Sequence, residues 1–262
     1  SRSCHPLCYR TIAVLLLILS AFMKQILFAL LAMMLFITSC DDGRIYEKEL
    51  VIPKQGLTLK MTGEITGLDS WPTNYSLVIA SFKEDNTNAE SAAVIPRKDN
   101  DAGRISAKLS GIKSDANDLE LCIIDALRDR VISYKTLTRE DFNVVGDTIY
   151  MEVGKVDVGM YKAIQQAVFD AKCISCHGAN GGAPRNLFLT EGKSYAHLVG
   201  VQSKADPDYK LVDPGNPSAS LLPKILNENG ILHHDHADIL EARTQYTLVT
   251  LIKNWIKAGA KE

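Results

Sequence analysis

The sequence predicts two domains, an all-β sandwich-like domain followed by an all-α domain. Its 262 residues, 46% of them hydrophobic, exceed what one small domain needs. Between residues 45 and 153, apolar residues alternate with polar ones in short stretches broken by turn residues, and from residue 158 they recur at helical spacing. This change of period indicates that strands give way to helices.

The charge balance excludes one class of partner. The chain carries 29 basic and 31 acidic residues, a formal net charge of -2, and contains no basic run. Nucleic-acid binding needs a concentrated positive patch. We therefore expect no nucleic-acid partner.

The N-terminal part has the features of an export signal. Two apolar runs, residues 12–19 and 26–37, are separated by Met23, Lys24 and Gln25. Neither run reaches the roughly 20 residues needed to span a bilayer. Read from Met23, the segment has a short positive start, an apolar stretch and small residues before a cysteine, which is the organisation of a secretory signal.

The end of this segment, residues 37–40, resembles a bacterial lipobox, in which cleavage leaves Cys40 as a lipidated N-terminus. Acyl chains stabilise anchoring by about 0.8 kcal/mol per buried methylene, so no spanning helix is needed. The alternative is one long apolar helix or hairpin across residues 12–37. We expect an exported protein, anchored by lipid in the bacterial envelope at the periplasmic or surface face of the outer membrane. The predicted order is upstream sequence from a misplaced start (1–22), signal peptide (23–39), and lipidated cysteine with a short tether (40–44).

Cysteine usage indicates a protein that is not built on disulfides. Of six cysteines, two lie in the upstream sequence, one is the lipid site and two belong to one CxxCH motif. Cys122 is left without a partner in a stretch whose alternate residues could face a core. We expect it to be a buried, inert thiol.

The domain at residues 45–153 contains no defensible catalytic constellation. Polar loops at residues 98–103 and 114–118 separate some of its strands. Short strands at this spacing favour an antiparallel sandwich, whose role could be binding, spacing or docking. The predicted strands are residues 57–61, 75–82, 104–109, 119–124, 131–137 and 148–153.

A helix at residues 158–169 leads directly into a CxxCH motif, which contains Cys173, Cys176 and His177. Two thiols three positions apart can each form a thioether to one of two neighbouring vinyl groups, and the adjacent histidine then lies under the iron. Gly178 leaves room at the haem edge. The motif predicts one covalently bound haem c.

Two other kinds of site use the same residue types. A thioredoxin-like redox pair needs a preceding strand in a βαβ unit, whereas here a helix precedes the motif and a Gly-rich loop follows. A zinc site needs further ligands, which His233, His234 and His236 could supply. The zinc alternative therefore stays open.

The motif and the segments that follow it resemble a bacterial cytochrome c-like haem-binding domain. The resemblance implies a small all-α cytochrome c fold over residues 156–262, in which the first and last helices cross. It also implies that Pro184 lies beside the haem and that its carbonyl accepts a hydrogen bond from the His177 ring. The closing helix has support of its own in an apolar stripe that ends near Gly259. The resemblance is carried by Phe169, CISCHG, Pro184, Leu187 and residues 195–201, 212–217, 220–222 and 251–260.

The chain departs from this family at the sixth iron ligand. Most such domains supply a methionine before the last helix, and this chain has none after Met160. His233, His234 and His236 stand at the corresponding place, and counting back from Trp255 favours His236. We infer bis-histidine ligation or a vacant site, and in the first case a lower reduction potential than that of a His/Met cytochrome.

Three functions are compatible with these features. A six-coordinate haem has no open site for substrate, which favours a single-electron carrier, not an enzyme, with other redox proteins as partners. The alternative is a surface or periplasmic binding lipoprotein whose haem domain is structural or redox-sensing. A haem peroxidase needs an open sixth site, and no distal acid–base pair is identifiable for it.

Overall fold

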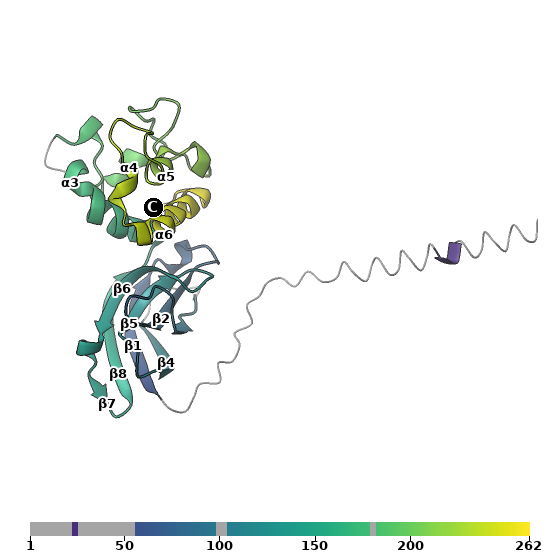
Figure 1. Cartoon of the computed structure of the whole chain (residues 1–262), viewed down its shortest axis with the longest axis vertical. Coiled ribbons are helices and arrows are strands. Elements are labelled where there is room, and N and C mark those ends of the chain that lie inside the picture. The colour runs from purple at the N-terminus through teal and green to yellow at the C-terminus, as the bar shows by residue number, and fades with distance from the viewer. Residues whose placement is uncertain (1–22, 26–55, 98–103, 179–181) are drawn as a thin grey trace, which may run out of the picture. The chain divides into compact units, whose positions relative to one another are not determined.

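The structure is a computed structural model that describes residues 23–25, 56–97, 104–178 and 182–262 (Figure 1). Cys40 lies outside the described residues, as does most of the expected leader and signal peptide. Contacts along the backbone group Ile52–Glu262 into one compact unit. Within the described ranges, no helix is both long enough and apolar enough to cross a membrane.

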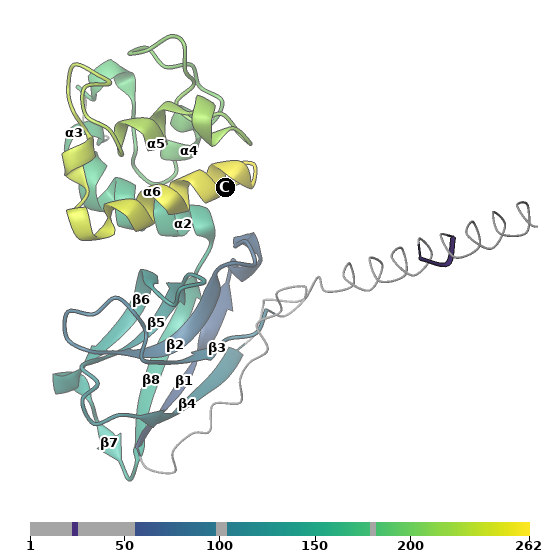
Figure 2. The same cartoon turned by 45° about the vertical axis from the view of Figure 1, so that its right-hand side comes forward.

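Two four-stranded sheets make up the first part of the described chain (Figures 1 and 2). Strand neighbours are antiparallel except for β1 and β8, which run parallel. Short 3-10 helices follow β1 (Leu68–Ser70) and β6 (Arg139–Asp141). One sheet has the order β4 (Arg104–Ile112), β1 (Leu57–Thr66), β8 (Thr148–Asp157), β7 (Val144–Val145), and the other β3 (Ser91–Val94), β2 (Ser76–Phe82), β5 (Asp118–Ile124), β6 (Arg130–Thr138).

The strands bury alternate side chains, because successive residues of a strand point to opposite faces of the sheet. On β1, Leu59 and Met61 are fully buried, whereas Lys60 between them is exposed. Ile79 of β2 pairs in register with Leu121 of β5, and both belong to the same core. The six stretches expected from the sequence correspond to β1, β2, β4, β5, β6 and β8, while β3 and β7 were not expected.

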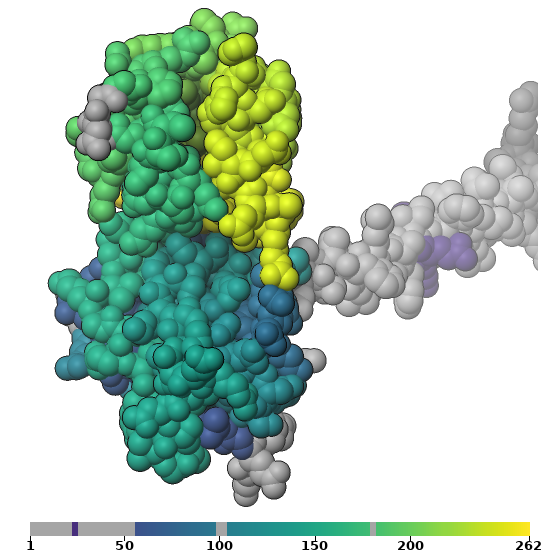
Figure 3. All heavy atoms as spheres, turned by 60° about the vertical axis from the view of Figure 1, so that its left-hand side comes forward, coloured from purple at the N-terminus to yellow at the C-terminus, as the bar shows by residue number. Residues whose placement is uncertain are grey.

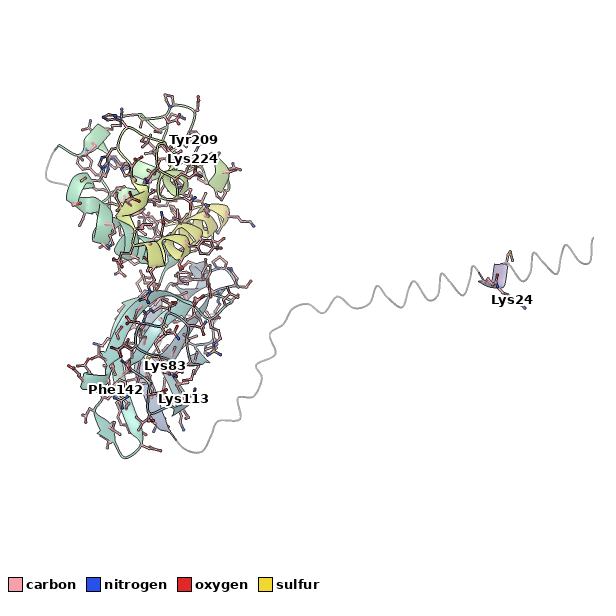
Figure 4. All side chains as sticks on the ribbon, viewed as in Figure 1. Lys24, Lys83, Lys113, Phe142, Tyr209 and Lys224 are labelled. Carbon is pink, nitrogen blue, oxygen red and sulfur yellow. The ribbon has the colours of Figure 1, made fainter. Side chains whose placement is uncertain are left out.

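A second, smaller apolar cluster lies on the other face of β2 and β5. It contains Val78, Phe82 and Cys122. Cys122 is fully buried, and burial raises the pKa of its thiol, so the prediction of an inert cysteine is confirmed. Directly after β2 and β4, the side chains of Lys83 and Lys113 both pair with the Glu90 carboxylate, at 3.0 Å and 3.7 Å respectively; both lysines are labelled in Figure 4.

The chain after β8 consists of short helical segments and one long helix, α6 (Ala242–Lys257). Figure 3 shows α6, in yellow, beside the green segments that follow β8. The other segments are α2 (Met160–Ile164), a π-helix (Gln165–Cys173), α3 (Ile174–His177), α4 (Ser194–Leu198), α5 (Leu221–Ile225) and 3-10 turns at Pro184–Asn186, Pro217–Ala219 and Ala237–Ile239.

The prediction of an all-α, cytochrome c-like domain over residues 156–262 is wrong. The described chain is mostly β-sheet, with about 32% of residues in strands and few helices, of which α6 is the main one. Between the motif and α6 the backbone even makes isolated β-bridges, such as Val199 with Val212 and Gln202 with Lys210. The physical reason is that five prolines between residues 184 and 223 interrupt helical hydrogen bonding, so the only α-helices described there are the short segments α4 and α5, separated by turns.

Hydrogen bonds join the strands to the helical segments. The Val158 carbonyl, directly after β8, accepts hydrogen bonds from the Trp71 indole and, at 3.2 Å, from the Tyr134 hydroxyl. On α6, the Asn254 side-chain amide donates to the Tyr75 hydroxyl at 2.7 Å. The start of α2 is thereby held at a defined place on the strands.

Glu120 of β5 provides a test of the strand packing. It is 1% exposed, its Oε1 pairs with Arg130, and its Oε2 has no hydrogen-bond partner. Burial raises the pKa of Glu120, and the Arg130 charge opposes that shift. The native state therefore holds a proton at pH values where the unfolded chain has released it, so this residue lowers stability as pH rises through that range.

We expect the free energy of unfolding of the wild type, relative to Glu120→Gln, to fall as pH rises above about 4.5, the ordinary glutamate value. Urea unfolding at a series of pH values measures this difference. A difference in unfolding free energy between the two proteins that does not change with pH would contradict the raised pKa of Glu120.

Candidate functional site

One continuous helical run brings the CxxCH motif to its site. α2, the π-helix and α3 follow each other without a break from Met160 to His177. Ile164, Val168 and Phe169 are fully buried and anchor the run in the core. The wide π turn is rare in proteins and is frequently found at functional sites. The sequence correctly placed a helix before the motif but gave no sign of its π geometry.

The two motif cysteines are free thiols. Cys173 is partly buried, and burial raises its pKa to about 11, with the nearby Cys176 adding to the shift. Cys176 is exposed. A thioredoxin-like pair depends on a lowered thiol pKa, so the environment of Cys173 disfavours that alternative.

The His177 ring is held by a backbone carbonyl. Its Nδ1 lies 3.0 Å from the Leu187 carbonyl oxygen, and its own carbonyl accepts a hydrogen bond from the Leu189 amide at 2.8 Å. A proton on Nδ1 that is donated to Leu187 leaves the Nε2 lone pair available for a metal. The sequence assigned the acceptor to Pro184, which is wrong by three residues, because the Pro184 carbonyl instead accepts from the Leu187 amide.

Gly178 is constrained by the backbone of α3. A Cβ atom built there would lie 2.6 Å from the Ile174 carbonyl oxygen, far inside van der Waals contact. This local crowding is a reason for glycine at the position that the sequence did not show. The role expected for Gly178 at a haem edge stays a prediction.

A cavity of about 990 Å³ adjoins the motif. Its walls are formed by the motif, the turn after it, α4, the loop at residues 201–205, α5 and the histidine-rich loop before α6. Among the predicted site residues that the structure describes, all except Gly178 line it. They are Cys173, Cys176, His177, Pro184, His233, His234 and His236.

His236 differs from its two neighbouring histidines. It is partly buried, whereas His233 and His234 are exposed, and its Nδ1 is buried with no hydrogen-bond partner. Burial is the largest cause of a lowered His236 pKa. A hydrogen bond with the His234 backbone opposes this shift, and the charges of His234 and His177 lower the pKa further. The neutral ring that results keeps a lone pair.

The loop that carries His236 is tied down at both ends. The Gly230 amide donates to the Asp235 carboxylate at 2.6 Å. From α6, the Gln245 side-chain amide donates to the carbonyls of Leu226 and Ala237 at 2.8 and 3.0 Å. The loop is therefore held by α6 through hydrogen bonds, in addition to the burial of its own Ala237 and Leu240.

Charged and apolar groups share the remaining cavity wall. Lys172, Arg185 and Lys204 line it among leucines and isoleucines. The Arg185 guanidinium donates to the Lys204 carbonyl at 2.9 Å, and the Lys204 ammonium to the Arg185 carbonyl at 3.3 Å. His197 also lines the cavity, its ring edge-on to Phe188.

Protein groups alone do not assemble a metal site here. In the described ranges, no group of three or more histidine, cysteine, aspartate or glutamate side chains is placed to hold a metal ion. The zinc alternative gains no support from the arrangement of the motif and the histidine loop.

Comparisons with protein-family models, with curated proteins and with solved structures find no match to this chain.

Gly178 offers a direct test of the motif's geometry. We expect Gly178→Ala to destabilise the protein by about 1–3 kcal/mol, because the new methyl group meets a backbone carbonyl that has little freedom to move. Thermal or urea unfolding measures the loss. Ser175→Ala, an exposed change in the same turn, serves as the control and should stay within about 0.5 kcal/mol of wild type. Equal stability of the two variants would contradict the stated role.

Proposed function

We propose that the chain is a c-type cytochrome that carries single electrons, with one haem attached to Cys173 and Cys176 and its iron ligated by His177. The term describes the covalent attachment and implies no particular fold. The observation that carries the proposal is that the CxxCH motif and the histidine loop, far apart in sequence, line the same cavity.

The residues present fit such a group. The cavity volume lies at the upper end of the roughly 300–1,000 Å³ typical of cofactor pockets, and most of its wall is apolar. The buried Nδ1 of His236 lacks a partner, which is costly for a polar atom unless something binds it. Arg185 and Lys204 supply positive charge for the two carboxylates of a haem, whereas Lys172 pairs with Glu241 at 3.0 Å.

Each residue has a stated task in this proposal. Cys173 and Cys176 hold the ring through thioethers, and the Leu187 carbonyl keeps the His177 imidazole in the tautomer whose Nε2 faces a metal. His236 supplies the sixth ligand, with His234 and His233 as alternates. The haem, when bound, supplies one-electron chemistry.

Two histidine ligands favour an electron carrier over an enzyme. With both axial positions filled, no site is left for a substrate at the iron. Ile174, between the two cysteines, is 37% exposed, and Cys176 is exposed as well. This exposed side of the motif is where small, transient contacts with redox partner proteins are expected.

The lipid anchor is part of the same proposal and rests on the lipobox-like residues 37–40. Lipidation of Cys40 would hold the haem-bearing part at a membrane surface in the bacterial envelope. Electron exchange with membrane-bound partners would then take place near that surface.

The covalent attachment is tested by the intact mass of the full chain expressed for export in a host with haem-attachment machinery. We expect the wild type and Cys122→Ala to carry the added mass of one haem after denaturation. The double change Cys173→Ala/Cys176→Ala should carry none. A wild type without added mass would overturn the proposal.

The sixth ligand is tested by visible spectra of the haem-loaded protein. We expect low-spin bands in the wild type and a conversion to high spin in His236→Ala, because that change removes the buried ring. His233→Ala and His234→Ala are matched controls and should stay low-spin. Conversion by either control, with His236→Ala unaffected, would move the assignment to that histidine.

The anchor is tested by fractionation of cells that express the whole chain. We expect the wild type in the membrane fraction and labelled by a fatty-acid probe, and Cys40→Ser in neither state, because serine offers no thiol for lipid attachment. Cys122→Ser is the control and should behave as wild type. Membrane association of Cys40→Ser without label would indicate that the apolar runs themselves are the anchor.

A further inference from the structure

A buried glutamine occupies the start of the π-helix that leads to the motif. Gln165 is 1% exposed and has apolar neighbours in Ile164, Val168 and Phe169. Burying an amide is costly unless its donors and its acceptor find partners. An apolar side chain would fill this helix position without needing hydrogen-bond partners. The groups that Gln165 bonds therefore indicate the role of its amide.

The Gln165 side chain is fully hydrogen-bonded. Its Nε2 donates to the Leu189 carbonyl at 2.9 Å and to the Asp170 carboxylate at 2.7 Å. Its Oε1 accepts from the Ser194 hydroxyl. The amide group therefore joins the π-helix to both ends of the segment at residues 189–194, at the Leu189 carbonyl and at the Ser194 hydroxyl.

The contact with Leu189 leads to the haem ligand. The Leu189 amide donates to the His177 carbonyl at 2.8 Å, and two residues earlier the Leu187 carbonyl accepts from the His177 ring at 3.0 Å. Residues 187–189 thus contact His177 at its backbone and at its ring. Gln165 holds the same short segment through the Leu189 carbonyl.

A second hydroxyl supports the glutamine. The Tyr161 hydroxyl lies 2.5 Å from the Ser194 hydroxyl, and burial raises the Tyr161 pKa to about 12, so the phenol keeps its proton at neutral pH. The Tyr161 ring stacks on Trp255 of α6 with ring centroids 5.1 Å apart. The chain of hydrogen bonds therefore ends in the packed contact between α2 and α6.

We propose that Gln165 is a positioning residue for the haem ligand: it holds residues 187–189 so that the Leu187 carbonyl stays on the His177 Nδ1 proton. The inference rests on the haem-binding function proposed above. A hydrogen bond at Nδ1 makes the imidazole a stronger electron donor at Nε2, which favours the oxidised metal. Loosening residues 187–189 should weaken that bond and raise the reduction potential.

The test compares Gln165→Leu with the wild type in the full, exported chain. Two quantities are measured, the midpoint reduction potential and the hydrogen-exchange rate of the Leu189 amide. We expect Gln165→Leu to shift the potential to more positive values. We also expect the Leu189 amide to exchange about tenfold faster, the change that follows from leaving a buried carbonyl unpaired.

Controls separate positioning from stability. Ile123→Val, in the strand core, lowers stability without touching this network, and should leave both quantities unchanged. Should Gln165→Leu fail to fold, Ser194→Ala removes the partner of the glutamine oxygen, and should move both quantities in the same direction by a smaller amount. A Leu189 exchange rate that does not rise in Gln165→Leu, or that rises no more than in Ile123→Val, would overturn the inference whatever the potential does.

The exchange measurement also distinguishes this inference from the proposed function. A wild type that carries no haem would remove the function, yet the Leu189 amide would still report whether Gln165 holds residues 187–189. Unchanged exchange in haem-loaded Gln165→Leu would leave the function standing and remove only the positioning role.

Discussion

The continuous helical run from Met160 to His177 is the constraint on which the site depends. Val168 and Phe169 are completely buried, so the run is fixed in the core and this fixes the direction in which its last residues leave it. His177 is then held by hydrogen bonds from its carbonyl and its ring to residues 187–189. Because both ends of this arrangement are tied to packed residues, the His177 ring is held in place by the protein itself, which is what preorganisation of the proposed ligand would require.

The opposite wall of the cavity is built by a different physical route. The histidine loop is held by hydrogen bonds as well as by its buried Ala237 and Leu240. Gln245 of α6 bonds its two ends, and the Gly230 amide bonds Asp235 within it. Packing of α6 against α2, through Trp255 and Tyr161, thus sets the separation of the two walls. Stability of the helix contact and geometry of the proposed haem site are therefore linked, and changes at that contact should affect both.

Local pattern predicted much of this protein, and tertiary contacts decided the rest. The alternation of apolar and polar residues predicted six strands, because it shows in the sequence itself which residues face a core. The cysteine spacing identified the motif, because its residues are neighbours in sequence. The prediction of an all-α domain was wrong because the helical spacing seen at residues 158–169 and in α6 was assumed to continue between them. The stretch between them is rich in proline and consists mainly of turns. Three features could not be predicted: Leu187 instead of Pro184 as the partner of the His177 ring, the backbone crowding at Gly178, and the position proposed for Gln165. Each depends on which backbone group lies opposite in the folded chain.

The proposed arrangement places one haem between His177 and a histidine of the loop before α6. The electron paramagnetic resonance spectrum of the oxidised, haem-loaded wild type reports both iron ligands together through its spin state and anisotropy. We expect the rhombic low-spin signal of two imidazole ligands. A nearly axial high-spin signal, from an iron with only His177 bound, would rule the arrangement out.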